Sequence, residues 1–162
     1  MNTSNFHKIQ EFHRVFDHPV NTTPRHDLLE DESLMQLRKD LIAEEFEEFQ
    51  EAIRDRSLPD VADAIGDLLY VVYGAAAVLG IDADKVFDQV HTSNMSKLCA
   101  TEEDAVSTVK HYKEVYERDV DYKPSMNGKW VVFDKNSGKI LKSVSFKTPC
   151  FDYLENNEKS ND

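Results

Sequence analysis

The sequence has few cysteines, few glycines and no uninterrupted long apolar run. Its two cysteines, Cys99 and Cys150, are too few for a disulfide framework and lack the spacing of a metal site. The longest apolar stretch, residues 68–81, is broken by two glycines and falls short of the roughly 20 residues that cross a membrane. The first ten residues contain no signal-like apolar segment. These absences predict a cytoplasmic protein with reduced thiols and no membrane partner.

Basic residues are also scarce. The 162 residues include 19 Lys and Arg against 31 Asp and Glu, which gives a formal net charge of −12. Such a surface repels nucleic acid, and no basic stripe offsets the acidity, so we expect no nucleic-acid partner. Apolar residues make up 40% of the chain, which at this length is enough for a folded core.

Apolar residues at helical spacing predict five helices. Their expected ranges are 6–17, 33–54, 59–79, 82–98 and 101–118, with Ser33 and Thr101 suited to begin the second and fifth. Two β-prone segments, residues 129–134 and 139–146, flank a turn-forming tetrapeptide and predict a hairpin. The predicted fold class is all-α: a four- to five-helix bundle over residues 1–120, a β-hairpin extension over 121–155 and a mobile tail at 156–162.

The acidity is concentrated in the second predicted helix. At about 100° per residue, Glu45 falls inside the apolar sector that is centred on Ile42, whereas Glu47 and Glu51 point away from it. Glu48 lies on the flank of that sector. An ionised carboxylate costs several kcal/mol to bury without a partner. Glu45 therefore requires a basic partner, a proton or a metal ion.

The third predicted helix carries a second acidic stripe. Asp60, Asp63 and Asp67 are spaced i, i+3, i+7 and share one side of the helix. The residues that follow, 68–79, are apolar nearly all round, which predicts a helix buried on every side. Because only a short break separates the second and third helices, we expect them to pack antiparallel with their acidic stripes facing each other.

Two interpretations of the facing carboxylates remain open. In the first, Arg38, Arg54 and Arg56 neutralise them and the domain is a non-catalytic helical oligomerisation or regulatory module. In the second, the excess negative charge binds a divalent cation; oxygen ligands without His or Cys favour Mg²⁺, with Mn²⁺ as a substitute. A triphosphate can approach such a cleft only when cations bridge the two, and a spare carboxylate can then align a water molecule.

Two short motifs mark the acidic helices. Residues 44–48 read Glu-Glu-Phe-Glu-Glu, residues 60–63 read Asp-Val-Ala-Asp, and residues 67–70 read Asp-Leu-Leu-Tyr. In this order the motifs resemble those of the all-α NTP pyrophosphatase superfamily, which includes MazG-type enzymes, dimeric dUTPases and phosphoribosyl-ATP pyrophosphohydrolases. The resemblance spans about residues 6–98.

The resemblance implies roles for six carboxylates. The metal ligands that it implies are Glu44, Glu45, Glu48, Asp60, Asp63 and Asp67. The first three are also the implied catalytic residues, with Glu44 binding metal or orienting the attacking water. Some branches place the second acidic pair at the positions of Ala64 and Asp67. Because Ala64 cannot bind a metal, the pair formed by Asp60 and Asp63 is preferred and Asp67 is an additional ligand.

The fourth predicted helix supplies the implied substrate contacts. Residues 94–97 read Asn-Met-Ser-Lys, the form of an Asn-x-x-Lys motif that contacts the nucleotide in this superfamily. The resemblance therefore implies that Asn94 and Lys97 bind substrate, with Lys97 meeting phosphate. His13 is a candidate for the base pocket. Ordinary core packing is the alternative interpretation of Asn94 and His13.

The predicted function is Mg²⁺-dependent hydrolysis of a nucleoside triphosphate, preferably a deoxynucleotide, to the monophosphate and pyrophosphate. Such a reaction serves sanitation of the nucleotide pool, and we expect a homodimer or homotetramer. Phosphoribosyl-ATP is the alternative substrate. The predicted hairpin carries no recognisable chemistry, and stabilisation of the helices is its default role.

Overall fold

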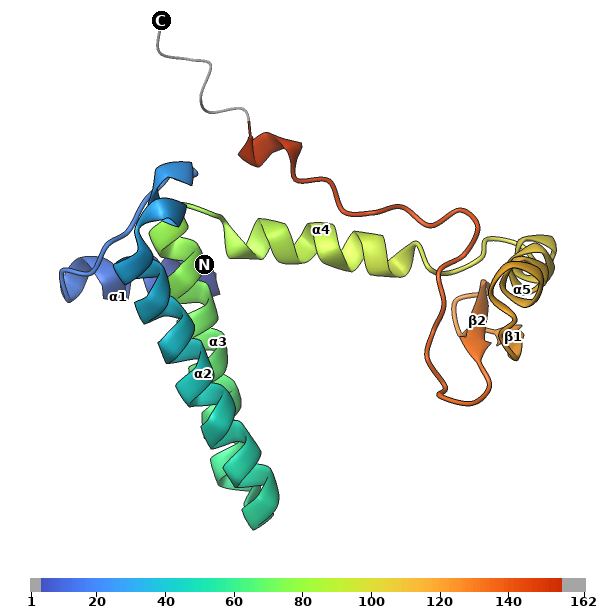
Figure 1. Cartoon of the computed structure of the whole chain (residues 1–162), viewed down its shortest axis with the longest axis horizontal. Helices are drawn as coiled ribbons and strands as arrows, with labels where there is room; N and C mark the ends of the chain where they lie inside the picture. Colours follow the sequence, from blue (N-terminus) through green and yellow to red (C-terminus); the bar gives the residue numbers. More distant parts are fainter. Residues whose placement is uncertain (1–3, 156–162) are drawn as a thin grey trace, which may run out of the picture. The chain divides into compact units, whose positions relative to one another are not determined.

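Helices make up most of the chain, as the sequence predicts. The computed structural model describes residues 4–155 (Figure 1), so the tail expected at 156–162 lies outside the described residues. The elements are α1 (Asn5–Val15), η1 (His26–Glu30), α2 (Glu32–Asp55), α3 (Leu58–Leu79), α4 (Ala83–Met95), α5 (Glu102–Tyr116), β1 (Val120–Pro124), β2 (Trp130–Asp134) and η2 (Asp152–Leu154). The predicted class, all-α with a small C-terminal hairpin, is confirmed.

Local side-chain chemistry sets the helix ends. Helix α2 begins one residue earlier than expected, because the side chain of Asp31, not that of Ser33, accepts a hydrogen bond from the Leu34 N–H at 2.9 Å. Ser57 caps α3, which has a proline in its first turn. Thr101 begins α5 with a reciprocal capping box, as its sequence predicts.

The chain divides into two compact units. Unit 1 comprises Met1–Val86 and Phe151–Asp162, and unit 2 comprises Phe87–Cys150. Unit 1 therefore holds α1 to α3 and the first turn of α4, whereas unit 2 holds the rest of α4, α5 and the sheet. This division groups α5 with the strands, although the sequence grouped residues through 120 with the helices.

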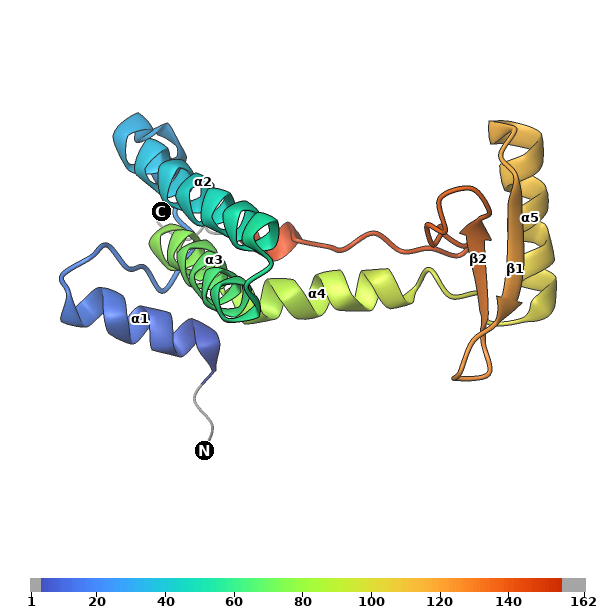
Figure 2. The same ribbon diagram turned by 90° about the horizontal axis from the view of Figure 1, so that it is seen from below.

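A helical hairpin forms the frame of unit 1. Helices α2 and α3 lie side by side, and α1 packs against α3 (Figure 2). Phe6 and Ile9 of α1 are buried with Ala77 of α3. Beside them the His13 ring, 4% exposed, donates from Nδ1 to the Pro19 carbonyl at 2.6 Å. The core of unit 1 therefore contains a polar side chain whose hydrogen bond fixes the loop after α1.

Helix α3 is not buried on every side. Leu69 is 53% exposed, and Ile65 and Val72 are also exposed, because the elements that contact this helix in the described chain, α1, α2 and η1, leave that side uncovered. The prediction of an all-round buried helix is therefore wrong. In the described chain this helix also has the length and apolar composition that could cross a membrane, a test that core helices of soluble proteins pass as well.

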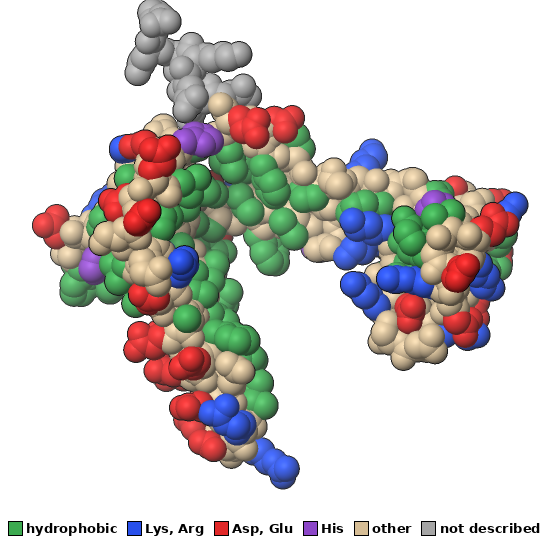
Figure 3. All heavy atoms as spheres, in the orientation of Figure 1, with side chains coloured by type: hydrophobic (Ala, Val, Ile, Leu, Met, Phe, Trp, Pro, Cys, Tyr) green, Lys and Arg blue, Asp and Glu red, His purple; other side chains and the backbone are tan. Residues whose placement is uncertain are grey.

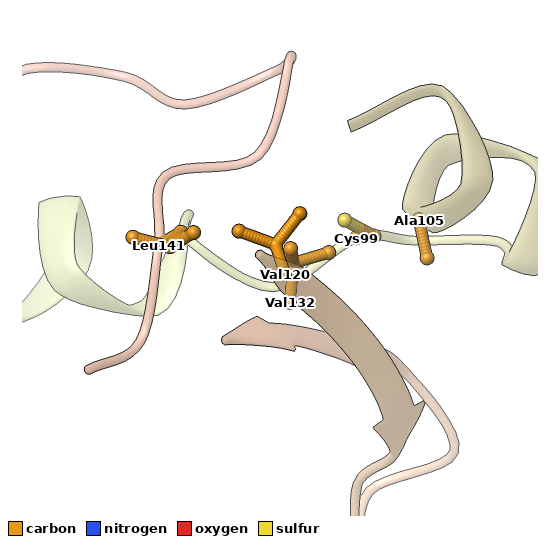
Figure 4. Close-up of a cluster of buried hydrophobic side chains, with 5 residues drawn as sticks. All are labelled: Cys99, Ala105, Val120, Val132 and Leu141. Atoms are coloured by element: carbon orange, nitrogen blue, oxygen red, sulfur yellow. The ribbon is translucent and has the colours of Figure 1, made fainter. Parts of the chain in front are cut away.

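Unit 2 is built on a short antiparallel sheet. Strand β1 pairs with β2 in a register that places Val120 opposite Asp134. Gly128 turns the chain between them with φ 76°, a left-handed conformation that suits glycine. The unit's core consists of Cys99, Ala105, Val120, Val132 and Leu141, which come together from α5, both strands and two connecting segments (Figure 4).

The second expected strand, residues 139–146, does not form. Phe133 and Ile140 make a single antiparallel bridge, but the ladder partner of β2 is β1. The backbone N–H of Val144 instead donates to the Thr108 hydroxyl of α5 at 3.1 Å. The Asp134 N–H donates to the Lys139 carbonyl and the Leu141 N–H to the Val132 carbonyl, so the predicted hairpin forms only beside its turn, and β1 takes the place of its second strand in the sheet.

Two glycines of α3 give a matched test of this packing. A Cβ at Gly74 would lie 3.3 Å from His13 Nε2, whereas a Cβ at Gly66 would meet nothing within 4 Å. We expect Gly66→Ala to stabilise the protein by up to about 1 kcal/mol through helix propensity. Gly74→Ala should lose that gain or destabilise the fold. Urea denaturation of both variants measures the difference, and equal stabilisation would contradict the close packing at Gly74.

Candidate functional site

Five carboxylates lie together where α2 packs against α3. The pKa of the Glu45 carboxyl is raised above its ordinary value, first by burial and then by the negative charges of its neighbours. In decreasing order of effect these neighbours are Glu48, Asp67, Glu44 and Asp63. Two of them belong to α3, so the acidic stripes of the two helices do face each other. Glu45 is the only one of the five that is partly buried; the others are exposed.

A shallow acidic pocket of about 340 Å³ adjoins this group. Its lining is Glu48, Glu51, Ala52, Asp55, Asp60, Asp63 and Ala64. Glu48 and Asp63 belong both to this pocket and to the neighbours of Glu45, which makes the two features one continuous acidic face. Figure 3 shows acidic side chains along one side of the α2–α3 hairpin and apolar side chains along another. Asp60 lies at the pocket end of this face.

The rotation of α2 differs from the expected one. Arg38 and Ala52 are the buried residues of α2, and Glu45, seven residues from each, is half-buried on the same side of the helix. Phe46 and Ile53, which the sequence placed within the buried sector, are about half exposed. The buried sector of α2 is therefore rotated from its expected centre toward Glu45, although it still includes Ile42 and Phe49, which are half-buried.

This rotation corrects the expectation for Glu51. The sequence placed its side chain on the far side of α2, but it lines the acidic pocket and pairs with Arg54 at 3.1 Å. Asp55, which the sequence did not single out, lines the pocket too. Its position seven residues after Glu48 is the signal that could have revealed it.

Of the arginines that could have neutralised the site, Arg54 pairs with Glu51 of the pocket and with none of the predicted ligands. In residues 4–155 no salt bridge involves any of the six predicted carboxylate ligands. Arg38 is buried, forms none of these ion pairs, and its Nε has no hydrogen-bond partner in the structure. Burial lowers the pKa of the Arg38 guanidinium. The acidic face therefore keeps its negative charge.

The donor chemistry of this face fits a hard divalent cation. Its donors are carboxylate oxygens without a basic partner, the ligand type that Mg²⁺ and Mn²⁺ prefer. In the part of the chain that the structure describes, no three acidic, His or Cys side chains are close enough together to hold an ion as they stand. The Glu side chains of α2 are long and mostly exposed, so rotamer changes can bring their oxygens together.

The predicted substrate residues lie elsewhere. His13 is in the core of unit 1, where burial, the largest effect, lowers the pKa of its ring and keeps it neutral near pH 7. Asn94 and Lys97 belong to unit 2, and Lys97 Nζ donates to Asn94 Oδ1 at 2.7 Å. The structure thus brings the six carboxylates onto one pair of helices and places the Asn-x-x-Lys motif in the other unit.

A helical hairpin with facing carboxylate stripes defines the class of all-α nucleotide pyrophosphatases. The chain matches the family model described as phosphoribosyl-ATP pyrophosphohydrolase over residues 9–94, more than half of its length. It therefore belongs to that family, which is part of the MazG-like superfamily of pyrophosphohydrolases. The membership implies a pyrophosphohydrolase activity.

A viral protein extends the similarity to the whole chain. The chain is 30% identical to an uncharacterized protein of Acanthamoeba polyphaga mimivirus, across 94% of this chain and 96% of that one. The family match ends within α4, whereas this similarity includes unit 2. Helix α5 and the sheet of unit 2 therefore lie outside the family match.

The raised pKa of Glu45 predicts a measurable effect on folding. Its folded-state pKa lies above the unfolded value of 4.5, so the folded state binds this proton more tightly than the unfolded state does. The resulting contribution of Glu45 to the stability of the fold is present below pH 4.5 and is lost as the pH rises through the raised pKa. Glu45→Gln should therefore stabilise the metal-free protein at pH 7.5, by about 0.5 kcal/mol as for other like-charge contacts. The advantage should shrink as the pH is lowered toward 4.5.

Urea denaturation in EDTA at several pH values tests this expectation. Glu47→Gln is the matched control, because it removes the same charge from the same helix and Glu47 does not contribute to the pKa of Glu45. A stabilisation of equal size in both variants would assign the effect to general net charge and not to the acidic face.

Proposed function

We propose that the protein hydrolyses nucleoside triphosphates, preferably deoxynucleotides, to monophosphate and pyrophosphate with Mg²⁺ as cofactor. The observation that supports this most directly is Glu45, a carboxyl of raised pKa among four further carboxylates that have no basic partner in the described chain. These residues lie on the helices that the family model matches. A structural salt-bridge module has no use for such an arrangement, since it would require partners that the site does not have.

The proposed chemistry divides the carboxylates by position. Glu45 and Glu48 of α2, with Asp60, Asp63 and Asp67 of α3, would hold Mg²⁺, which supplies charge stabilisation to phosphate oxygens when bound. Their negative charges repel a free triphosphate and therefore make the acidic face selective for metal-bound nucleotide. Because the pKa of Glu45 is raised, protons compete with Mg²⁺ for its carboxylate in mild acid. Activity should therefore decline there.

Glu44 is the proposed residue for the attacking water. Its side chain is exposed at the edge of the acidic face and close enough to act on the Glu45 pKa. It would accept the proton as the water oxygen forms a bond to the α-phosphorus, while the bond from that phosphorus to the bridging oxygen breaks and pyrophosphate leaves with the electron pair. Lys97 and Asn94 are the proposed phosphate contacts, and His13 is a proposed base-pocket residue.

Deoxynucleoside triphosphates and phosphoribosyl-ATP are the two candidate substrates. The family model is named for phosphoribosyl-ATP, which carries the same triphosphate with an added phosphoribosyl group on the base. The chemistry above acts only on the triphosphate and so is common to both. Sanitation of the nucleotide pool, the proposed role, requires that ordinary or damaged deoxynucleotides be turned over at least as well as phosphoribosyl-ATP.

Variants of α2 test the site. With a panel of nucleotides and Mg²⁺, we expect monophosphate and pyrophosphate as the first products, resolved by chromatography. Glu45→Gln and Glu48→Gln should lower kcat/KM by about 100-fold or more, the loss expected when a metal ligand is removed. Glu47→Gln, on the same helix, should stay within about twofold of the parent. Orthophosphate as the first product, or equal losses in all three variants, would overturn the proposal.

We propose in addition that two copies pair through the apolar side of the α2–α3 hairpin. Phe46 and Ile53 of α2, with Ile65, Leu69 and Val72 of α3, are 43–53% exposed and together exceed the scattered apolar residues of an ordinary surface. Two identical hairpins placed face to face cover both apolar stripes with the same contacts, as in other two-fold dimers. A tetramer would repeat this contact once more.

Light scattering combined with size exclusion tests the pairing. The parent protein should elute as a dimer or tetramer, and Phe46→Glu with Leu69→Glu should yield monomer, because each copy would bring two charges into the apolar contact. Val115→Glu is the control, since Val115 of α5 is exposed but lies in unit 2. A monomeric parent, or a paired double variant, contradicts this part of the proposal.

A further inference from the structure

Charge is divided unequally between the two units. Unit 2, Phe87–Cys150, holds ten of the 19 basic residues but only nine of the 31 acidic ones, a formal net charge of +1. The remaining residues therefore carry −13. Figure 3 shows Lys and Arg side chains gathered on unit 2. A positive local potential in an otherwise acidic protein is a feature that an anionic ligand can use.

The cations of unit 2 surround a pocket at the C-terminal end of α5. This pocket, of about 340 Å³, is lined by Lys97, Arg118, Lys139 and Lys142 together with Tyr112 and Tyr116. In the described chain none of these four cations forms a salt bridge. Arg118 is close enough to lower the pKa of the Asp134 carboxyl, and Lys97 is held by the Asn94 amide. Lys142 Nζ lies 4.4 Å from the centroid of the Phe146 ring, a contact that leaves its N–H groups to a ligand.

Aromatic rings form one wall of the same pocket. Tyr112 and Tyr116 lie one turn apart on α5 with their ring centroids 5.5 Å apart. Tyr112 packs against the core of unit 2, whereas Tyr116 is 56% exposed. A second pocket of about 360 Å³ adjoins the first and shares both tyrosines and Lys142. Tyr116 is therefore an exposed ring on a rigid support with cations beside it.

We propose that this pocket binds a nucleoside phosphate without a metal ion, with the base stacked on Tyr116 and the phosphates at Arg118, Lys139 and Lys142. Base stacking on an aromatic side chain contributes about 1–3 kcal/mol. The site differs from the acidic face in its chemistry: it attracts phosphate directly, whereas the acidic face needs a bridging cation. It lies in unit 2, beyond the residues that the family model matches, and does not rest on the proposed hydrolysis.

A single nucleotide fits these observations better than a nucleic acid. The pocket has the volume of a small-molecule site. A long polyanion would extend beyond the four cations of the pocket and would meet the nine acidic residues of unit 2 as well as its other basic ones. The ligand is therefore expected to carry a few phosphates and one base.

Calorimetric titration with ATP and with tripolyphosphate in EDTA tests the site in the full chain. We expect both to bind. Lys139→Glu with Lys142→Glu should weaken both by about tenfold or more, because two phosphate contacts become repulsive. Tyr116→Ala should weaken ATP by about tenfold and leave tripolyphosphate unchanged, because only the base stacks. Lys113→Glu with Lys129→Glu makes the same charge change on unit 2 outside both pockets and should retain binding.

Three outcomes would overturn the site. The first is no binding of ATP in EDTA. The second is its loss in Glu45→Gln, which would place the nucleotide at the acidic face. The third is binding of a single-stranded oligonucleotide much more tightly than ATP, which would indicate a nucleic-acid surface. Failure of the proposed hydrolysis gives a different result. In that case no nucleotide is hydrolysed with Mg²⁺, but ATP still binds in EDTA, including to the Glu45→Gln variant.

Discussion

Repulsion among carboxylates on α2 and α3 is the interaction on which the rest of unit 1 depends. The two longest helices pack with acidic stripes facing each other, and in the described chain no salt bridge involves Glu45 or the four carboxylates around it. A contact of this kind weakens the fold unless something else compensates for it. The apolar packing of α1 on α3 supplies part of that compensation, and a cation at the acidic face would remove the cause.

The same constraint explains why so much apolar surface stays uncovered. A helix has only a limited width to present to its neighbour, and the buried side of α2 includes Glu45. Part of its apolar stripe, with Phe46 and Ile53, is therefore displaced outward, where a second copy could cover it. The proposed metal binding and the proposed self-association would thus be linked by the rotation of one helix, because a turn that buried Phe46 and Ile53 on α3 would also move Glu45 away from it.

The two units differ in the charge that they offer to a phosphate group. Unit 1 is strongly acidic and can approach a triphosphate only through a cation, whereas unit 2 offers Lys and Arg side chains beside an exposed tyrosine. The acidic motifs were readable from the sequence because their spacing is local to one helix each. The basic pocket was not, since Lys97, Tyr116 and Lys139 are far apart in the chain and meet only through the fold of unit 2.

The sequence by itself determined the helices and the acidic motifs, because helical periodicity, capping side chains and spacing along one helix are local properties. Only the tertiary structure decided which side of α2 faces α3. Periodicity fixes angles within a helix but not the neighbour that each side meets, so Glu51 was placed on the wrong side. The partner of β2 was likewise decided by tertiary contacts: residues 139–141 bond to β2 only beside the turn, and the Val144 N–H farther along donates to the Thr108 hydroxyl of α5.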